Sequence, residues 1–329
     1  MTTPMRTSTL ITALWLILAA AGCARPEFRP GAVWTDTDGA GILYDEGRYY
    51  WFGEHKTAGE AGNLAQVGVH CYSSENLYDW RDEGIALSVA PEGSGSPIEK
   101  GCILERPKVI RNARTGKYVM WFHLEPKGAG YTGALSGVAV SDRATGPYTF
   151  LRAVRPDAGV YPTNALPQHF GKSRAAGMHF DGCSLPEHHV SLNLVGRDAA
   201  QGQMARDMTL FVDDDGRAYH IYSSEENSTL HISELTDDYL AHSGRYARFF
   251  AGRFMEAPAL FKRGGRYYLM MSGCTGWAPN AARSAVAESI WGPWTELGNP
   301  CEGPGAETTY DSQSTFVVPV AGTDRFIYM

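Results

Sequence analysis

Residues 253–271 read RFMEAPALFKRGGRYYLMM. An apolar run, a pair of glycines and an aromatic run in that order are typical of a β-hairpin, because glycine permits the tight turn between two strands. Glu256 stands at the start of the first strand among small and apolar residues. Such a setting raises the pKa of a carboxyl group toward the range where a general acid works. An ordinary surface glutamate at a strand start is the alternative interpretation of this stretch.

The same hairpin pattern recurs four more times along the chain. Each copy has an apolar strand, a turn that contains glycine and an aromatic strand, and the copies lie at residues 42–52, 108–122, 209–222 and 315–328. A second hairpin pattern, a strand followed by a turn with an aromatic residue, lies at residues 67–80, 136–148, 229–240 and 285–294. Four strands per unit in five units predict an all-β fold, a five-bladed β-propeller. A β-sandwich is the alternative, but sandwiches do not repeat a four-strand unit.

The spacing of the repeats is uneven in two places. Residues 156–204 form an insertion rich in Gly, Pro, His and Ser with little periodicity, which predicts a long loop. The fifth unit reaches Met329 after only its first hairpin. We therefore expect the fifth blade to be incomplete at the C-terminus, with the sheet either closed by the N-terminal strand or left open.

The composition favours a protein that binds sugars. The chain has 329 residues, 37 glycines, 12% aromatic residues and a net charge of -7. This length buries an ample core, and the aromatic residues supply flat apolar surfaces on which sugar rings stack. No basic stripe is present, which argues against nucleic acid as a partner.

Residues 1–24 have the features of an export signal. Arg6 precedes an apolar segment at 10–21, and small residues follow it. Ala20-Ala21-Gly22-Cys23 also resembles a bacterial lipobox, in which Cys23 would carry a lipid. We expect a periplasmic, extracellular or outer-membrane protein, secreted freely or anchored at Cys23, with residues 25–329 as its one propeller domain.

Five further cysteines follow Cys23, so at least one of them stays unpaired. Export permits disulfides, and the cysteine spacings fit no zinc site. Cys274 and Cys301 flank one hairpin region and are the preferred pair; two buried free thiols are the alternative.

Several short motifs resemble glycoside hydrolase family 43, especially its exo-β-1,3-galactanase and galactofuranosidase subgroups. They are ERPK, RDMT, YSSE, EAPA, SGCTGWAPN and SQS, at residues 105–108, 206–209, 222–225, 256–259, 272–280 and 312–314. The resemblance runs from about residue 34 to 329. It implies a five-bladed propeller with its active site at one end of the axis and an inverting mechanism, in which an acid protonates the leaving oxygen and a water attacks the opposite face.

The resemblance assigns roles to four residues. Glu256 matches the general acid, and Asp207 matches the aspartate that orients this acid and tunes its pKa. Gln313 matches a glutamine that positions the attacking water, and Glu105 matches a carboxylate that holds the sugar and the water. Without the resemblance, Asp207 is equally a strand-start residue beside an arginine, and Glu105 is equally an ion-pair partner of its basic neighbours.

Other residues at the predicted blade mouths suit sugar binding, because sugars need both stacking surfaces and hydroxyl partners. These expected substrate-binding residues are Glu54, Tyr131, Asn227, Thr275, Trp277 and Asn280. A tryptophan packed beneath a loop is the alternative interpretation of Trp277. The segment after residues 36–39 is shorter than in the family, which affects part of the expected sugar pocket.

The leading hypothesis is an exo-acting inverting glycoside hydrolase that cleaves galactose-containing plant polysaccharide such as β-1,3-galactan. A β-galactofuranosidase or α-L-arabinofuranosidase is the enzymatic alternative, and a non-catalytic glycan-binding propeller is the alternative from another class. The residues indicate no cofactor and no metal ligands. The resemblance implies that a Ca²⁺ ion can lie on the propeller axis, for which the sequence assigns no ligands. We expect a monomer whose partner is an oligo- or polysaccharide.

Overall fold

The computed structural model describes residues 34–59, 61–180, 185, 189–276 and 278–329. The predicted export signal, with Cys23, and the predicted sugar contact Trp277 lie outside these residues, so these predictions remain open. Residues Val33–Met329 form one compact unit. In the described part of the chain, no helix has both the length and the apolar character needed to cross a membrane.

Four antiparallel sheets of four strands each follow one another along the chain. The first contains β1 (Trp34–Asp45), β2 (Arg48–Lys56), β3 (Gln66–Ser74) and β4 (Arg81–Ser88). The second contains β5 (Ile103–Arg111), β6 (Tyr118–Glu125), β7 (Leu135–Ser141) and β8 (Thr149–Val154). The third contains β9 (Met208–Val212), β10 (Ala218–Ser224), β11 (Thr229–Leu235) and β12 (His242–Phe249). The fourth contains β13 (Met255–Arg263), β14 (Arg266–Gly273), β15 (Arg283–Ala287) and β16 (Thr295–Gly298).

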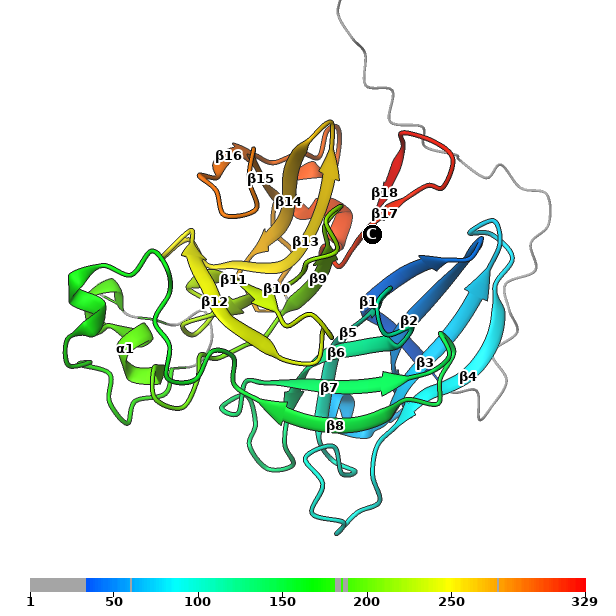
Figure 1. Ribbon diagram of the computed structural model, residues 1–329, viewed down its shortest axis with the longest axis horizontal. Helices are drawn as coiled ribbons and strands as arrows, with labels where there is room; N and C mark the ends of the chain where they lie inside the picture. Colours follow the sequence, from blue (N-terminus) through cyan, green and yellow to red (C-terminus); the bar gives the residue numbers. More distant parts are fainter. Residues whose placement is uncertain (1–33, 60, 181–184, 186–188, 277) are drawn as a thin grey trace, which may run out of the picture. The chain divides into compact units, whose positions relative to one another are not determined.

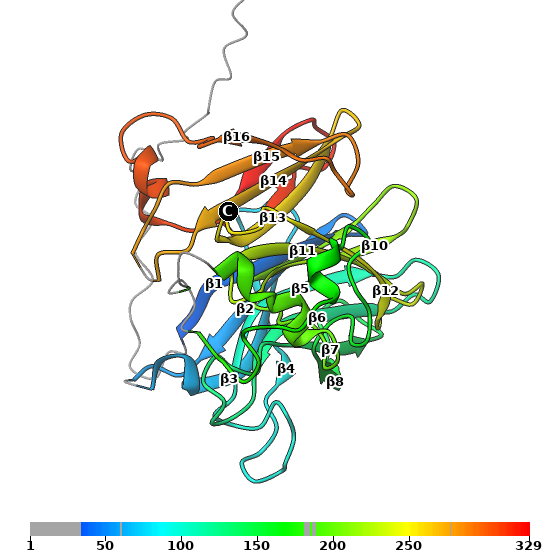
Figure 2. The same cartoon turned by 90° about the vertical axis from the view of Figure 1, so that its left-hand side faces the viewer.

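The sheets are arranged as the blades of a propeller, with the first strand of each blade innermost (Figure 1). Strand β1 contacts β5, β5 contacts β9, and β9 contacts β13, so the inner strands meet in sequence around the centre. Figure 2 shows the same sheets from the side, with the strands of each blade side by side. The predicted all-β propeller is therefore confirmed.

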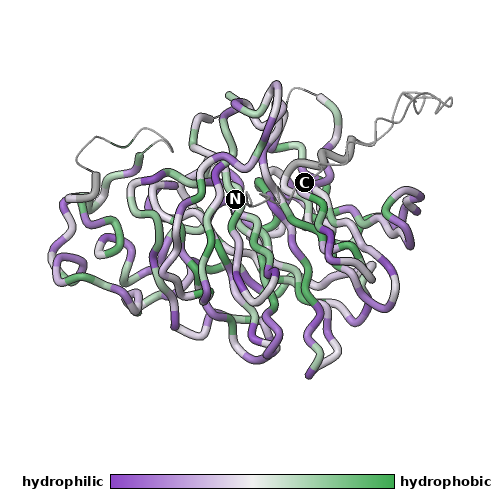
Figure 3. Tube along the Cα trace, turned by 90° about the horizontal axis from the view of Figure 1, so that it is seen from above, coloured by the Kyte–Doolittle hydropathy of each residue, from purple (hydrophilic) through white to green (hydrophobic). Residues whose placement is uncertain are grey.

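The core lies between neighbouring blades, as expected when each sheet has two apolar faces to cover. Phe52, Leu104 and Phe122 belong to a cluster between the first and second blades. Trp121 and Tyr222 belong to the cluster between the second and third blades, and both side chains are fully buried. Hydrophobic and hydrophilic segments are interspersed throughout the trace (Figure 3), and the buried clusters show that apolar residues from neighbouring sheets meet between the blades.

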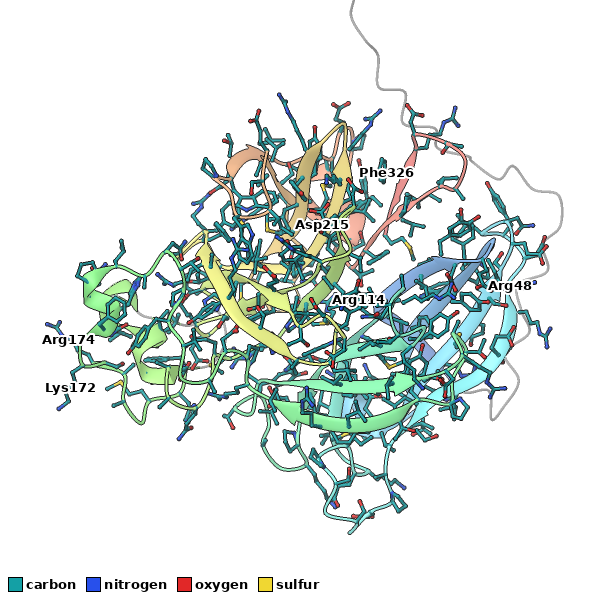
Figure 4. The ribbon with its side chains drawn as sticks, viewed as in Figure 1. Arg48, Arg114, Lys172, Arg174, Asp215 and Phe326 are labelled. Carbon is teal, nitrogen blue, oxygen red and sulfur yellow. The ribbon has the colours of Figure 1, made fainter. Side chains whose placement is uncertain are left out.

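The predicted fifth repeat is a two-stranded sheet, β17 (Val317–Pro319) and β18 (Phe326–Tyr328). The described residues therefore form four complete blades and not five. Phe326 packs on Phe261 of β13, with ring centroids 4.9 Å apart, and it lies on the side of the hairpin that faces the fourth blade (Figure 4). Val318 packs with Ile42 of the first blade. The hairpin thus contacts both of its neighbours.

The insertion at 156–204 contains helical turns that its low periodicity did not predict. They are η2 (Pro167–Phe170), η3 (His189–Leu192) and α1 (Leu194–Asp198). Lys172 and Arg174 project from its outer edge (Figure 4). Arg197 ties the insertion to the third blade, because its Nη1 donates to Glu226 Oε1 at 2.8 Å.

The predicted disulfide between Cys274 and Cys301 is wrong. Cys301 is a free thiol, whereas Cys274 is in a disulfide, so the two are not bonded to each other. Cys274 and Cys301 flank one hairpin, but this position in the sequence does not determine which cysteines pair. A disulfide needs a specific separation and orientation of the two Cβ atoms, which sequence spacing does not fix.

Candidate active site

A cavity of about 870 Å³ opens where the inner strands of the blades meet. All four predicted catalytic residues line it, and each comes from a different part of the propeller. Glu105 lies on β5, Asp207 immediately precedes β9, Glu256 lies on β13, and Gln313 precedes β17. Residues more than 200 positions apart in the chain therefore surround one space, as the family resemblance implies.

Matching β-bulges turn two of the carboxylates into the cavity. The register between β5 and β6 shifts after Glu105, and the register between β13 and β14 shifts after Glu256. The next residue in each bulge has a left-handed backbone, with φ of 56° at Arg106 and 49° at Ala257, and a proline follows each. A bulge bends its strand and redirects a side chain, which explains why the Glu-X-Pro sequence occurs in both blades.

Glu256 is placed as a general acid should be. Its Oε1 accepts a hydrogen bond from Asn227 Nδ2 at 2.7 Å, and the Cys274 sulfur lies 3.2 Å from the same oxygen. Because Cys274 is in a disulfide, it has no thiol proton to donate. Burial, reinforced by the charge of Asp207, raises the pKa of Glu256 to about 8. Glu256 therefore carries a proton at neutral pH, as an acid catalyst requires.

A strained turn aims Asn227 at the acid. Glu225, Glu226 and Asn227 have three consecutive left-handed backbone conformations, with φ of 51°, 57° and 62°. Such conformations cost about 1–3 kcal/mol each for residues other than glycine, and they cluster at functional sites. Among the described residues, no donor reaches the buried Oδ1 of Asn227. That oxygen is therefore a buried acceptor without a partner among these residues, while the Nδ2 end of the amide faces Glu256.

Arg106 connects Asp207 to Gln313. Its Nε and Nη2 donate to the two carboxylate oxygens of Asp207 at 3.0 Å each, and Nη2 also donates to Gln313 Oε1 at 2.5 Å. Gln313 Nε2 donates to Ser272 Oγ at 2.9 Å. Both ends of the Gln313 amide are fixed in this way, which suits a group that positions a water molecule. Asp207 Oδ2 additionally accepts from the backbone N–H of Ala257, the neighbour of the acid, at 3.1 Å.

Glu105 accepts hydrogen bonds on both oxygens. Asn63 Nδ2 and the Tyr131 hydroxyl donate to Oε1 at 2.9 and 2.7 Å, and His123 Nδ1 lies 3.0 Å from Oε2. Burial works to raise the pKa of Glu105, but the bond to His123 and its charge outweigh burial and lower this pKa to about 2. Glu105 is therefore an anion at neutral pH.

Glu54 forms the third carboxylate of the cavity wall. Its Oε2 pairs with Lys56 Nζ at 2.8 Å, and its Oε1 accepts from the Arg106 N–H at 3.1 Å. Burial, with the nearby charge of Glu105, raises the pKa of Glu54 to about 7. Gly39 lies against these groups with φ of 73°, and a Cβ there would stand 2.8 Å from Glu54 Oε1. Any side chain at Gly39 would enter this contact.

Four of the six predicted substrate-binding residues line the same cavity: Glu54, Tyr131, Asn227 and Asn280. Thr275 lies instead in an adjoining groove, which Asn280 also borders. Its hydroxyl donates to the Ala278 carbonyl at 2.5 Å and accepts from Asn280 Nδ2 at 2.7 Å. Thr275 therefore shapes the loop that carries Asn280.

The sequence reasoning missed Arg106, Lys56, Asn63 and His123 as parts of the cavity wall. Arg106 was considered only as an ion-pair partner of its neighbour Glu105, although it bonds to Asp207, 101 positions away. Arg206, the arginine beside Asp207 in the chain, does not bond to it and donates to Glu226 at 3.0 Å. The one local signal was the repeated Glu-X-Pro sequence, which marks both bulges.

A Ca²⁺ ion between the inner strands does not fit the side chains found there. The buried Nζ of Lys108 donates to the Gly39 carbonyl and lies 3.4 Å from Thr315 Oγ1, so an amine fills the space between three segments of the propeller centre. Ca²⁺ requires six to eight oxygen ligands. Within the described ranges, no group of three or more His, Cys, Asp or Glu side chains is placed to bind a metal.

Comparison with known proteins agrees with this geometry. The pattern of "Glycosyl hydrolases family 43" matches residues 189–312. A solved family 43 β-1,3-galactosidase, with galactodeoxynojirimycin bound, is 50% identical with a TM-score of 0.81, and the match covers 91% of this chain and 88% of that one. The chain belongs to glycosyl hydrolase family 43. The resemblance recognised in the short motifs is thus confirmed.

Two further relatives of this family 43 chain show the range of known activities. An exo-β-1,3-galactanase from Clostridium thermocellum is 35% identical with a TM-score of 0.68, and the match covers 88% of this chain and 53% of that one. A curated β-D-galactofuranosidase from Aspergillus niger is 31% identical over 96 residues, which are 29% of this chain and 27% of that protein. The chain thus spans about half the length of the galactanase, and the shared segment is about a quarter of the galactofuranosidase.

The position of Asp207 predicts how the pH profile depends on it. Removing its charge with Asp207→Asn takes away a cause that raises the pKa of Glu256 and leaves Arg106, which lowers that pKa, uncompensated. The basic limb of kcat/KM, which reports loss of the acid's proton, should move to lower pH by about one unit or more, a roughly tenfold loss of rate on that limb. Asp213→Asn, which removes a carboxylate bonded to Lys262 outside the cavity, is the matched control and should leave the limb in place. An unmoved limb in Asp207→Asn would rule out its assigned role.

Proposed function

We propose that this chain is an exo-acting inverting glycoside hydrolase that releases galactose from β-1,3-linked galactan. The observation that carries the proposal is the convergence of Glu256, Asp207, Glu105 and Gln313 on one cavity. The acid carries a proton, and the Gln313 amide is fixed by hydrogen bonds at both ends. The galactanase and galactosidase relatives favour galactose as the sugar and a chain end as the point of attack.

The proposed reaction is one displacement. Glu256 gives its proton to the glycosidic oxygen while a water molecule held by Gln313 attacks the anomeric carbon from the other face. The proton of that water leaves to solvent or to a cavity carboxylate, and Glu256 is reprotonated from solvent before the next turnover. Asp207 keeps the pKa of the acid high, and Glu105 accepts hydroxyl hydrogen bonds from the sugar. The steps that we propose use protein side chains and water, with no cofactor.

The test identifies the released sugar and the anomer in which it first appears. We expect β-1,3-galactan to yield galactose, and ¹H NMR during the first minutes to show the α-anomer before mutarotation equilibrates it. Galactose that appears first as the β-anomer would contradict inversion. β-1,4-Galactan is the control and should yield no product.

One observation supports a second candidate, a β-galactofuranosidase, since the curated relative has that activity. Aryl β-D-galactofuranoside and aryl α-L-arabinofuranoside belong in the same assay. If either is cleaved while galactan is not, the furanosidase alternative replaces the galactanase. Binding of galacto-oligosaccharides with no product from any substrate would instead favour the glycan-binding module.

We also propose that β17 and β18 are the inner hairpin of a fifth blade, since they lie between the first and fourth blades and contact both. Export, lipid attachment at Cys23 and a monomeric state remain part of the proposal.

A further inference from the structure

A chain of charged groups runs from Glu105 in the cavity wall into the protein, and the proposed reaction does not use its inner members directly. His123 on β6 stands opposite Glu105 in the strand register, and Glu125 follows two positions later on the same face of β6. His123 Nε2 lies 3.0 Å from Glu125 Oε1, and His123 Nδ1 lies 3.0 Å from Glu105 Oε2. His123 is 2% exposed and Glu125 is fully buried.

Both ring nitrogens of His123 face carboxylate oxygens, so both must carry a proton to make these hydrogen bonds. Burial disfavours the charged ring, but the bonds to Glu105 and Glu125 outweigh it and raise the pKa of His123 to about 9. The result is an imidazolium held between two carboxylates; Glu105 and His123 border the cavity, whereas Glu125 does not.

Glu125 is itself fixed by the backbone. Its Oε2 accepts from the N–H of Gly133 at 2.7 Å, and both of its oxygens lie 3.0 Å from the N–H of Ala134. Arg155 is a further charged group near Glu125. Burial lowers the pKa of Arg155, and the charge of Glu125 offsets part of this lowering. The Nε of Arg155 donates to the Gly133 carbonyl at 2.9 Å. The segment that Glu125 holds also carries Tyr131, which donates to Glu105.

We propose that His123 and Glu125 form a positioning pair that keeps Glu105 ionised and fixed in orientation. The lone pairs of Glu105 that accept no protein hydrogen bond then face the sugar. This inference rests on the proposed function, since it assigns Glu105 to sugar binding. His123 acts through Glu105 and does not itself touch substrate in this role.

The other groups around Glu105 do not replace this pair. Tyr131 and Asn63 donate neutral hydrogen bonds to it. Arg106, its chain neighbour, contributes a favourable charge, but its guanidinium is engaged by Asp207 and Gln313. Glu54 on β2 faces Glu105 with a like charge, and the two carboxylates disfavour each other's ionisation. Lys56 pairs with Glu54 at 2.8 Å, and His123 is the cation bonded to Glu105 itself, so each carboxylate has its own positive partner.

Two substitutions of His123 separate charge from hydrogen bonding. An asparagine places its amide nitrogen near the position of Nδ1, so His123→Asn keeps a donor to Glu105 but removes the positive charge and the contact with Glu125. A glutamine reaches the position of Nε2, so His123→Gln keeps the contact with Glu125 and loses the donor to Glu105. The matched control is His70→Asn, which removes another buried histidine paired with a carboxylate, Asp82, outside the cavity.

The first measurement is calorimetric binding of β-1,3-galactobiose at pH 7 and pH 5, with every variant made in a Glu256→Gln background so that the acid does not titrate. The parent should lose little affinity between these pH values beyond what Glu54 contributes. His123→Asn should lose further affinity at pH 5, by about tenfold for each unit that the pKa of Glu105 rises above that pH. His123→Gln should lose at least as much, and His70→Asn should match the parent.

The second measurement needs no ligand. A histidine whose pKa rises on folding contributes stability that is present below its unfolded pKa, near 6.5, and lost as pH rises through about 9. Urea unfolding of the parent should therefore show stability falling between pH 6.5 and 9. This component should be missing in His123→Asn and present in His70→Asn.

The outcomes test the positioning pair separately from the proposed substrate. An equal pH dependence of binding in His123→Asn and the parent, or an equal pH dependence of stability, would overturn the positioning pair. The expected stability difference in a protein that binds no galactobiose would instead overturn the proposed substrate. Should His123→Asn fail to fold, Glu125→Gln takes its place, with a smaller loss of affinity in the same direction expected and an unchanged pH dependence counting against the pair.

Discussion

Glu256→Gln should reduce the hydrolysis of β-1,3-galactan by roughly 10²–10⁴-fold, the usual contribution of a general acid. A departing sugar is a poor leaving group that needs the proton, whereas an activated aryl group leaves readily as an anion. The same variant should therefore lose much less activity on an aryl galactoside. The amide is isosteric with the acid and still offers an oxygen to Asn227, which now donates to Glu256 Oε1 at 2.7 Å, so the cavity keeps its geometry.

The measurement is kcat/KM for galactan and for a series of aryl galactosides of falling leaving-group pKa. In Glu256→Gln, the dependence on that pKa should become steeper than in the parent. Glu234→Gln is a suitable control, because Glu234 pairs with Arg245 on the third blade outside the cavity, and it should leave the dependence unchanged. An equal loss on all substrates, or no loss, would remove Glu256 from the role of acid.

The repeat pattern predicted the blades because each strand carries its own signal. An apolar run, a glycine turn and an aromatic run are local features, and four complete blades formed where such hairpins recur. The two-stranded fifth repeat was also visible in the sequence, where residues 315–328 supply one hairpin in place of two. The short helices of the insertion were missed, because helices of four or five residues leave little periodicity to detect.

The catalytic residues were found through short motifs, but the interactions that make them work are long-range. Burial and Asp207 set the pKa of Glu256, and the bond that links Asp207 to Arg106 depends on a bulge with left-handed backbone at Arg106. No pattern in the sequence pairs residue 106 with residue 207. The same limit explains the error about Cys274, since the disulfide follows from the folded arrangement of the loops.

Gln313→Ala should lower kcat by about 10²-fold or more on galactan and on aryl galactosides alike. The attacking water is required whatever group leaves, and displacement of a reacting group by about 1 Å costs a factor of this size. The substitution removes the amide that Arg106 and Ser272 hold in place, so the water loses its partner and Arg106 loses one of its acceptors.

The contrast with Glu256→Gln is what tests the assignment of Gln313. A lost acid makes the rate depend more steeply on the leaving group, whereas a lost water-positioning group lowers the whole series in parallel. Gln203→Ala is the matched control, because Gln203 is a fully buried glutamine in the insertion and does not line the cavity. If Gln313→Ala raises KM and leaves kcat near the parent value, Gln313 holds the sugar and not the water. The attacking water would then have to be oriented by Glu105, whose Oε1 faces the same cavity and already accepts from Tyr131 and Asn63.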